Sequence, residues 1–120
     1  MSLIANGAKL SGGSDWPVDP LFPWYAIERA VTRTADSWYG YAKNPLNANQ
    51  AISLSSALRA YTLNSAFQMK QDDTTGSIEK GKQADLIVLN QNLFRINPGK
   101  IADTKVLMTM LGGKVVHQAD

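Results

Sequence analysis

The chain contains no cysteine and only one histidine, His117, among its 120 residues. The absence of cysteine excludes disulfide bonds, thiolate metal sites and cysteine nucleophiles. A hydrolytic zinc site usually takes three protein ligands from histidine, aspartate, glutamate or cysteine and leaves one position for water. A single histidine near the carboxyl end therefore cannot complete a nitrogen-rich zinc site within one copy of the chain.

Long apolar runs and segregated charges are also scarce. No stretch approaches the ~18 apolar residues of a membrane span, and the first residues do not show the basic and apolar pattern of a secretory signal. The formal net charge is +2 and the basic residues are scattered. We therefore expect no membrane and no nucleic-acid partner, and a cytoplasmic location by default.

Length and composition limit the size of the fold. With 44% hydrophobic and 18% charged residues, a chain of 120 residues can form one domain, or a domain fragment, with its own core. A complete (β/α)₈ barrel needs about 250 residues. The chain by itself is therefore too short for such a barrel.

The first part of the chain has mainly helical patterns. Apolar residues at three- and four-residue spacing predict a helix from about 22 to 34, and Ser53 can cap a second helix. Thr62 or Asn64 then permits a break before a short helix through Ala66 and Phe67. Residues 8–12 predict a short strand, and residues 35–52 a loop. Trp24 and Tyr25 fit either a core position or a ligand-stacking pair.

The second part has β patterns. The polar segment 71–76 predicts a boundary, and we divide the chain into residues 1–72 and 73–120. Residues 84–89 are apolar and β-branched, which predicts a strand. Two further β-prone runs, 106–111 and 114–118, flank Gly112 and Gly113, and this pattern is typical of a hairpin. His117 is expected at an exposed position of that hairpin.

Three segments together resemble a known enzyme family. They are GSDWP at residues 13–17, ALRAYTLNSA at residues 57–66 and GSIEKGKQADLIVL at residues 76–89. Their order and spacing are similar to the end of the metal-dependent amidohydrolases, in particular the YtcJ-like amidohydrolase 3 branch. The family's paired histidines and its other metal ligands precede these segments, so the chain resembles a carboxy-terminal segment of such an enzyme.

The resemblance implies a fold class of α/β to α+β. The expected architecture is the last strand and helices of an amidohydrolase (β/α)₈ barrel, within residues 1–72, followed by part of a small β-sandwich domain, within residues 73–120. Segment 57–66 is expected to pack helices through its small residues. Lys82 and Asp85 are expected to pair across a turn and to act structurally.

The resemblance also implies a chemistry for Asp15. In the complete parent enzyme this carboxylate contacts the divalent metal, expected to be zinc, and takes a proton from the attacking water. Trp16 and Trp38 are the candidates for substrate contact, with Tyr39 and Tyr41 on the same loop as Trp38. The alternatives from the residues alone are that Ser14 or Asp15 caps a turn and that the aromatic residues anchor a connector.

These readings lead to two hypotheses about function. In the first, the chain is the carboxy-terminal part of an enzyme that hydrolyses carbon–nitrogen bonds of a small molecule, holds no metal alone and is inactive alone. It would then bind a missing amino-terminal barrel portion or self-associate. In the second, it is a non-catalytic α+β binding or interaction module. The adjacent Asp72 and Asp73 are read as a solvated turn and not as a metal site.

Overall fold

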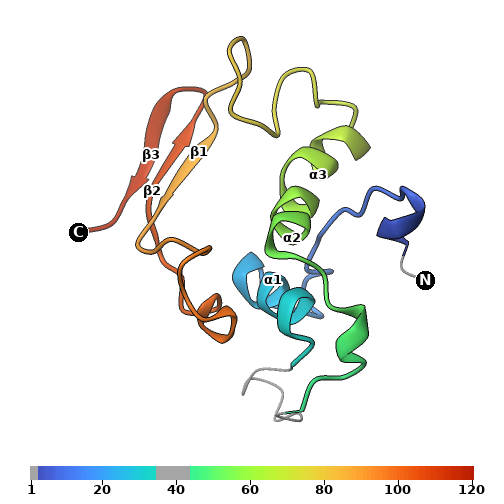
Figure 1. The fold of residues 1–120 in the computed structure, drawn as a ribbon. Helices are drawn as coiled ribbons and strands as arrows, with labels where there is room; N and C mark the ends of the chain where they lie inside the picture. The colour runs from blue at the N-terminus through green and yellow to red at the C-terminus, as the bar shows by residue number, and fades with distance from the viewer. Residues whose placement is uncertain (1–2, 35–43) are drawn as a thin grey trace.

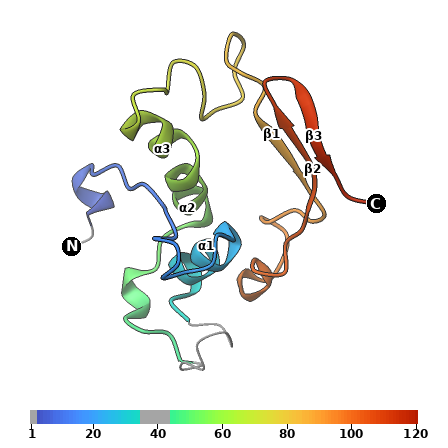
Figure 2. The ribbon, with the colours of Figure 1, turned by 180° about the vertical axis from the view of Figure 1, so that it is seen from behind.

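The computed structural model of the chain describes residues 3–34 and 44–120. Within these ranges, helices occupy one side of the molecule and an antiparallel sheet the other (Figure 1). The view from behind shows the same separation, with the two sides joined by the segments before and after β1 (Figure 2). The elements are α1 (Pro23–Thr32), α2 (Leu54–Tyr61), α3 (Leu63–Gln68), β1 (Leu86–Leu89), β2 (Val106–Leu111) and β3 (Lys114–Gln118).

Helix α1 lies within the predicted range 22–34 and is shorter at both ends. Pro23 occupies its first turn, where the missing N–H has no helical partner to lose. The helix ends at Arg33, whose backbone is left-handed with φ 60°. Trp24 and Ile27 are its buried residues. Trp24 is therefore part of the core, which decides against its reading as a ligand-stacking residue.

Helices α2 and α3 confirm the predicted cap and the predicted break. The side chain of Ser53 accepts a hydrogen bond from the backbone N–H of Ser56 at 3.1 Å, so it caps α2. Thr62 separates the two helices with φ −127° and ψ −98°. Ala57, Ala60 and Ala66 are buried, in agreement with a packing role for small residues.

The predicted strand at residues 8–12 is absent from this structure. These residues form no ladder with another strand, because their backbone groups bond to the α2–α3 helices instead. The Gly12 N–H donates to the Ala60 carbonyl at 2.9 Å, and the Asn64 side chain donates to the Leu10 carbonyl. A strand needs a neighbouring strand for its hydrogen bonds, and the helices take that place here.

The second half forms an antiparallel sheet with the order β1-β2-β3. The hairpin lies at the predicted residues, and Gly112 and Gly113 both have positive φ, 54° and 79°, as a two-residue hairpin turn of this class requires. The first strand is shorter than predicted and begins at Leu86. His117 lies on β3 and is exposed, as expected.

The core joins the helices to the segment between β1 and β2. Its buried members are Trp24, Ile27, Ala57, Leu93 and Ile101. Ile27 and Ile101 are each 1% exposed, and full burial of one such side chain contributes about 1.5–3 kcal/mol. Glu28 of α1 also accepts a hydrogen bond from the Ala102 N–H at 2.8 Å. Both halves of the chain therefore contribute to one core.

The structure confirms the coarse fold class, a small α/β arrangement with a three-stranded sheet. The assignment to barrel and sandwich remains an expectation. Among the described residues, no helix combines the length and the apolar character needed to cross a bilayer.

Candidate active site

Asp15 lies at the start of an exposed turn. The backbone N–H of Val18 donates to the Asp15 carbonyl at 2.8 Å, and Asp15 itself is left-handed with φ 52°. A residue other than glycine rarely adopts this conformation, although aspartate tolerates it better than most, and such residues are enriched at functional sites. The turn thus presents the Asp15 carboxylate to solvent, and Trp16 beside it is 64% exposed.

The chain before this turn is attached to the helices α2 and α3. Asn64 Nδ2 donates to the Leu10 carbonyl at 2.9 Å, and Ser11 Oγ donates to the Asn64 carbonyl at 3.2 Å. The Gly12 N–H donates to the Ala60 carbonyl at 2.9 Å. Three successive residues are therefore fixed to one place in the fold.

Gly12 also allows the backbone to approach the ring of Tyr61. A Cβ at position 12 would lie 2.2 Å from a ring carbon, which a real side chain does not tolerate. The contact half-buries the Tyr61 side chain, and this burial raises the pKa of its phenol, with a smaller contribution from the charge of Asp19. Glycine at position 12 is therefore a packing requirement.

The chain after the turn is attached to α1. Arg29 Nη1 bonds both carboxylate oxygens of Asp19, at 2.9 and 3.0 Å. The side chains are only 26% and 19% exposed, so this ion pair is less screened than a surface pair. The Asp15 turn is thus held between α2–α3 on one side and α1 on the other.

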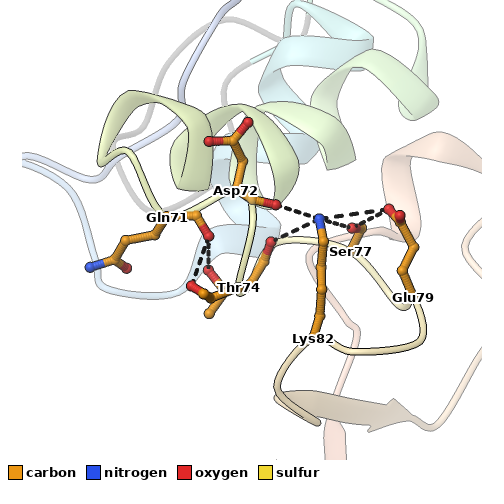
Figure 3. A network of polar contacts seen from close by, with 7 residues as sticks. Gln71, Asp72, Thr74, Ser77, Glu79 and Lys82 are labelled. Carbon is orange, nitrogen blue, oxygen red and sulfur yellow. Dashed lines mark hydrogen bonds and ion pairs between the residues drawn. The ribbon is translucent and has the colours of Figure 1, made fainter.

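The third motif docks on the same helices. Gly76 has φ 86°, and a Cβ there would lie 2.6 Å from the Cβ of Ala66 in α3. Lys82 connects the residues on both sides of Gly76 (Figure 3). Its ammonium group donates to the Asp72 carbonyl and, at 2.7 Å, to Ser77 Oγ. Ser77 Oγ donates in turn to Glu79.

These contacts correct one prediction. Lys82 does not pair with Asp85: its nearest carboxylate is Glu79, at 3.7 Å. Asp85 instead accepts a hydrogen bond from the backbone N–H of Gly112 at 2.7 Å. The Lys82 ammonium group lies within reach of the backbone carbonyls of the 72–75 turn and bonds them. The Asp85 carboxylate is occupied by the N–H of the hairpin turn. Both side chains nevertheless make structural contacts, Lys82 with the 72–77 loop and Asp85 with the hairpin turn.

The pKa of Glu79 is lowered, first by the hydrogen bond from Ser77 and then by the charge of Lys82. The Lys82 ammonium group donates to a carbonyl oxygen and to a hydroxyl oxygen. Ser77 Oγ accepts from Lys82 at 2.7 Å and donates to Glu79, so the three side chains form one polar network.

Trp38, Tyr39 and Tyr41 lie outside the described residues. In the parts that the structure describes, there is no group of three or more histidine, aspartate or glutamate side chains that could hold a metal ion. Asp15 is therefore one carboxylate without a ligand set, and a catalytic metal does not fit these residues alone.

An apolar hollow of about 500 Å³ lies between the helices and the sheet. Asp15 is not among its lining residues, so it is separate from the candidate site. The lining includes Trp24, Ile27, Leu58, Tyr61, Leu89 and Leu93.

Sequence reasoning missed the way the three motifs depend on one another. The prediction that segment 57–66 packs helices is correct for its alanines. Tyr61 and Asn64, however, contact residues 10–12, directly before the first motif, and Ala66 contacts the third motif. The spacing of Tyr61 and Asn64, three residues apart and flanking a helix break, was the available signal.

Comparison with known proteins assigns the family. Residues 1–117 match the family described as "Amidohydrolase family". The chain is 29% identical over 119 residues to a putative amidohydrolase, YtcJ, of Bacillus subtilis, covering 98% of this chain and 22% of that protein. It is 32% identical over 117 residues to an N-substituted formamide deformylase of Arthrobacter pascens, covering 98% and 21%.

A solved amidohydrolase from Thermotoga maritima is similar in structure, with a TM-score of 0.67 and 25% sequence identity, covering 98% of this chain and 25% of that one. The chain spans about a fifth of the length of the curated relatives it matches. The match over residues 1–117 agrees with the three motifs described above, and the chain belongs to the amidohydrolase family.

Proposed function

We propose that the chain is the carboxy-terminal part of a metal-dependent amidohydrolase that hydrolyses carbon–nitrogen bonds, such as non-peptide amides. The family match over residues 1–117 carries this proposal. In it, residues 1–72 supply the last helices of the barrel, and residues 8–12, which pair with no strand here, would form its last strand beside the preceding strands of the complete enzyme. Residues 73–120 supply part of a small β-domain. The preceding barrel elements and the substrate-selecting loops belong to the rest of the enzyme.

Asp15 is the catalytic residue of the proposal. Its left-handed turn and exposure support a carboxylate that faces the reacting water, from which it takes a proton. A divalent metal, by proposal zinc, would polarise the substrate and the water in the complete enzyme. Because the described residues lack a ligand set, that metal requires side chains from outside them. Trp16 is the proposed substrate contact, with Trp38 as a second.

Exposed apolar side chains on the sheet support a partner for this chain. Val88, Leu111 and Val116 are 45%, 60% and 59% exposed. We propose that the preceding barrel portion, or a second copy, covers such surfaces. Sedimentation equilibrium tests the second copy, because a clean monomer with a cooperative melt would show that the chain closes its own core.

A chimera tests the function directly. The chain would replace the matching segment of the Arthrobacter pascens deformylase, to which it is 32% identical. Formate release from an N-substituted formamide is the measurement. We expect an active chimera, and a loss of about 10²- to 10⁴-fold in kcat/KM on Asp15→Asn, as for removal of an acid–base group.

Asp73→Asn is the matched control, because it removes another exposed carboxylate from the same chain. It should leave formate release unchanged. Full activity of the Asp15→Asn chimera would remove Asp15 from the catalytic set. A folded chimera that releases no formate would instead favour the alternative, a binding module that kept the scaffold.

A further inference from the structure

The turn that carries Asp15 is attached to the helices at a fixed point on each side. Gly12 is bonded to α2, and Asp19 is bonded to α1. Only the six residues 13–18 lie between them. The two helices pack on each other through Trp24, Ile27 and Ala57, so the fixed points belong to one rigid unit.

We propose that Asn64 is the positioning residue that holds the chain directly before the first of these fixed points and thereby aims the Asp15 carboxylate. The proposal rests on the function proposed for Asp15. Asn64 bonds the chain before the turn with both its side chain and its backbone. Its Nδ2 donates to the Leu10 carbonyl at 2.9 Å, and its carbonyl accepts from Ser11 Oγ at 3.2 Å. One residue of α3 thus sets the register of the chain that enters the turn.

The amide chemistry of Asn64 is specific to this task. Its Nδ2 donates to a carbonyl oxygen, which a carboxylate in the same place cannot do. The bond spans 54 positions of sequence. It lies in a partly buried place, where loss of the donor leaves the Leu10 carbonyl with a poorer partner. Asn64→Asp therefore keeps the size of the side chain but replaces the hydrogen-bond donor to the Leu10 carbonyl with an acceptor oxygen.

Asp15 itself needs this support. A residue other than glycine in the left-handed region is strained, and it persists when the surrounding structure over-determines it. The backbone bond from Val18 to Asp15 closes the turn only while its two ends keep their spacing. Release of the Leu10 end gives the turn room to relax toward ordinary backbone angles. The carboxylate would then lose its fixed direction.

Amide hydrogen exchange on the whole chain tests the anchoring without any need for activity. In Asn64→Asp, exchange of the Gly12 and Val18 amides should become about 3- to 10-fold faster, the loss expected for one hydrogen bond. The amides of Ala57 and Arg33, which are bonded within or at the end of α2 and α1, should keep their rates. Gln68→Glu makes the same amide-to-carboxylate change at an exposed position of α3 and should leave all four rates unchanged.

Ser11→Ala provides a milder variant in case Asn64→Asp does not fold. It removes the hydroxyl that donates to the Asn64 carbonyl and should accelerate the same two amides. Unchanged exchange at Gly12 and Val18 in the folded variants would overturn the proposal. A uniform acceleration of all four amides would also overturn it, because Asn64 would then stabilise the whole fold and not the turn.

The deformylase chimera connects the anchoring to chemistry. In it, Asn64→Asp should lower kcat by about tenfold with KM nearly unchanged, because the carboxylate is misdirected while the substrate site is intact. Faster exchange with unchanged kcat would overturn the positioning role. An active Asp15→Asn chimera would instead overturn the proposed function, and the exchange result separates the two failures.

Discussion

Asp85 closes the turn of the β2–β3 hairpin: its Oδ1 accepts a 2.7 Å hydrogen bond from the backbone N–H of Gly112. The neighbouring Gly113 N–H donates to the Ala84 carbonyl at 3.1 Å. The two residues that precede β1, Ala84 and Asp85, therefore bind the turn between β2 and β3. The aspartate of the third motif is thus a structural acceptor.

Loss of this acceptor should destabilise the sheet. We expect Asp85→Ala to lower the free energy of unfolding by about 0.5–1.5 kcal/mol, because a single hydrogen bond at an exposed site is lost. Urea denaturation measures the change. Asp73→Ala, at another exposed aspartate, is the control and should have almost no effect. Equal shifts for both variants would mean that the bond contributes nothing.

Lys82 should be more important than its neighbour Lys80. Its side chain is 14% exposed and its ammonium group bonds the Asp72 carbonyl and Ser77. We expect Lys82→Met to cost about 1.5–3 kcal/mol, the range for hydrogen bonds to a charged group. Lys80→Met changes an exposed lysine in the same turn and should be nearly neutral. Thermal unfolding followed by circular dichroism compares them, and similar melting curves would refute the role of Lys82.

Gly12 and Gly13 form a matched pair for the contact with Tyr61. We expect Gly12→Ala to cost about 1–3 kcal/mol, because the new Cβ overlaps the Tyr61 ring. Gly13→Ala should be close to neutral, since a Cβ at that position meets open space. Urea denaturation of both variants gives the comparison. An equally large loss at Gly13 would point to backbone strain in place of ring contact.

Tyr61 should make the fold sensitive to alkali. Burial, and secondarily Asp19, raise the pKa of this phenol in the folded chain above its unfolded value. The phenol therefore keeps its proton to a higher pH in the folded state than in the unfolded state. The stability that this difference contributes is complete below pH about 10 and is lost as the pH rises through the folded-state pKa. The free energy of unfolding of Tyr61→Phe, measured across this range, should fall less steeply than that of the unchanged chain. Identical slopes would contradict the shift.

Metal binding distinguishes the chain alone from the complete enzyme. Given one histidine and no cysteine, we expect the purified chain to lose zinc on dialysis and to hydrolyse amides no faster than the background. Zinc content by atomic absorption and an amide hydrolysis assay provide the test. Tight one-to-one zinc with metal-dependent turnover would require ligands shared between copies and would change the proposal.

Local features of this protein followed from the sequence by itself. The Ser53 cap, the break at Thr62 and the hairpin at Gly112 and Gly113 each depend on hydrogen bonds or backbone angles within a few residues. Such signals are complete within a short window of sequence. The three motifs likewise indicate the amidohydrolase family without any tertiary contact.

The long-range partners were decided by the tertiary structure. Residues 8–12 have β propensity, yet the helices α2 and α3 took their hydrogen bonds. Lys82 had several oxygens within reach, and the folding of the 72–75 turn brought carbonyls to it ahead of Asp85. Asn64 met Leu10 across 54 positions. Spacing along the chain does not encode which distant groups meet, because that depends on how the helices pack.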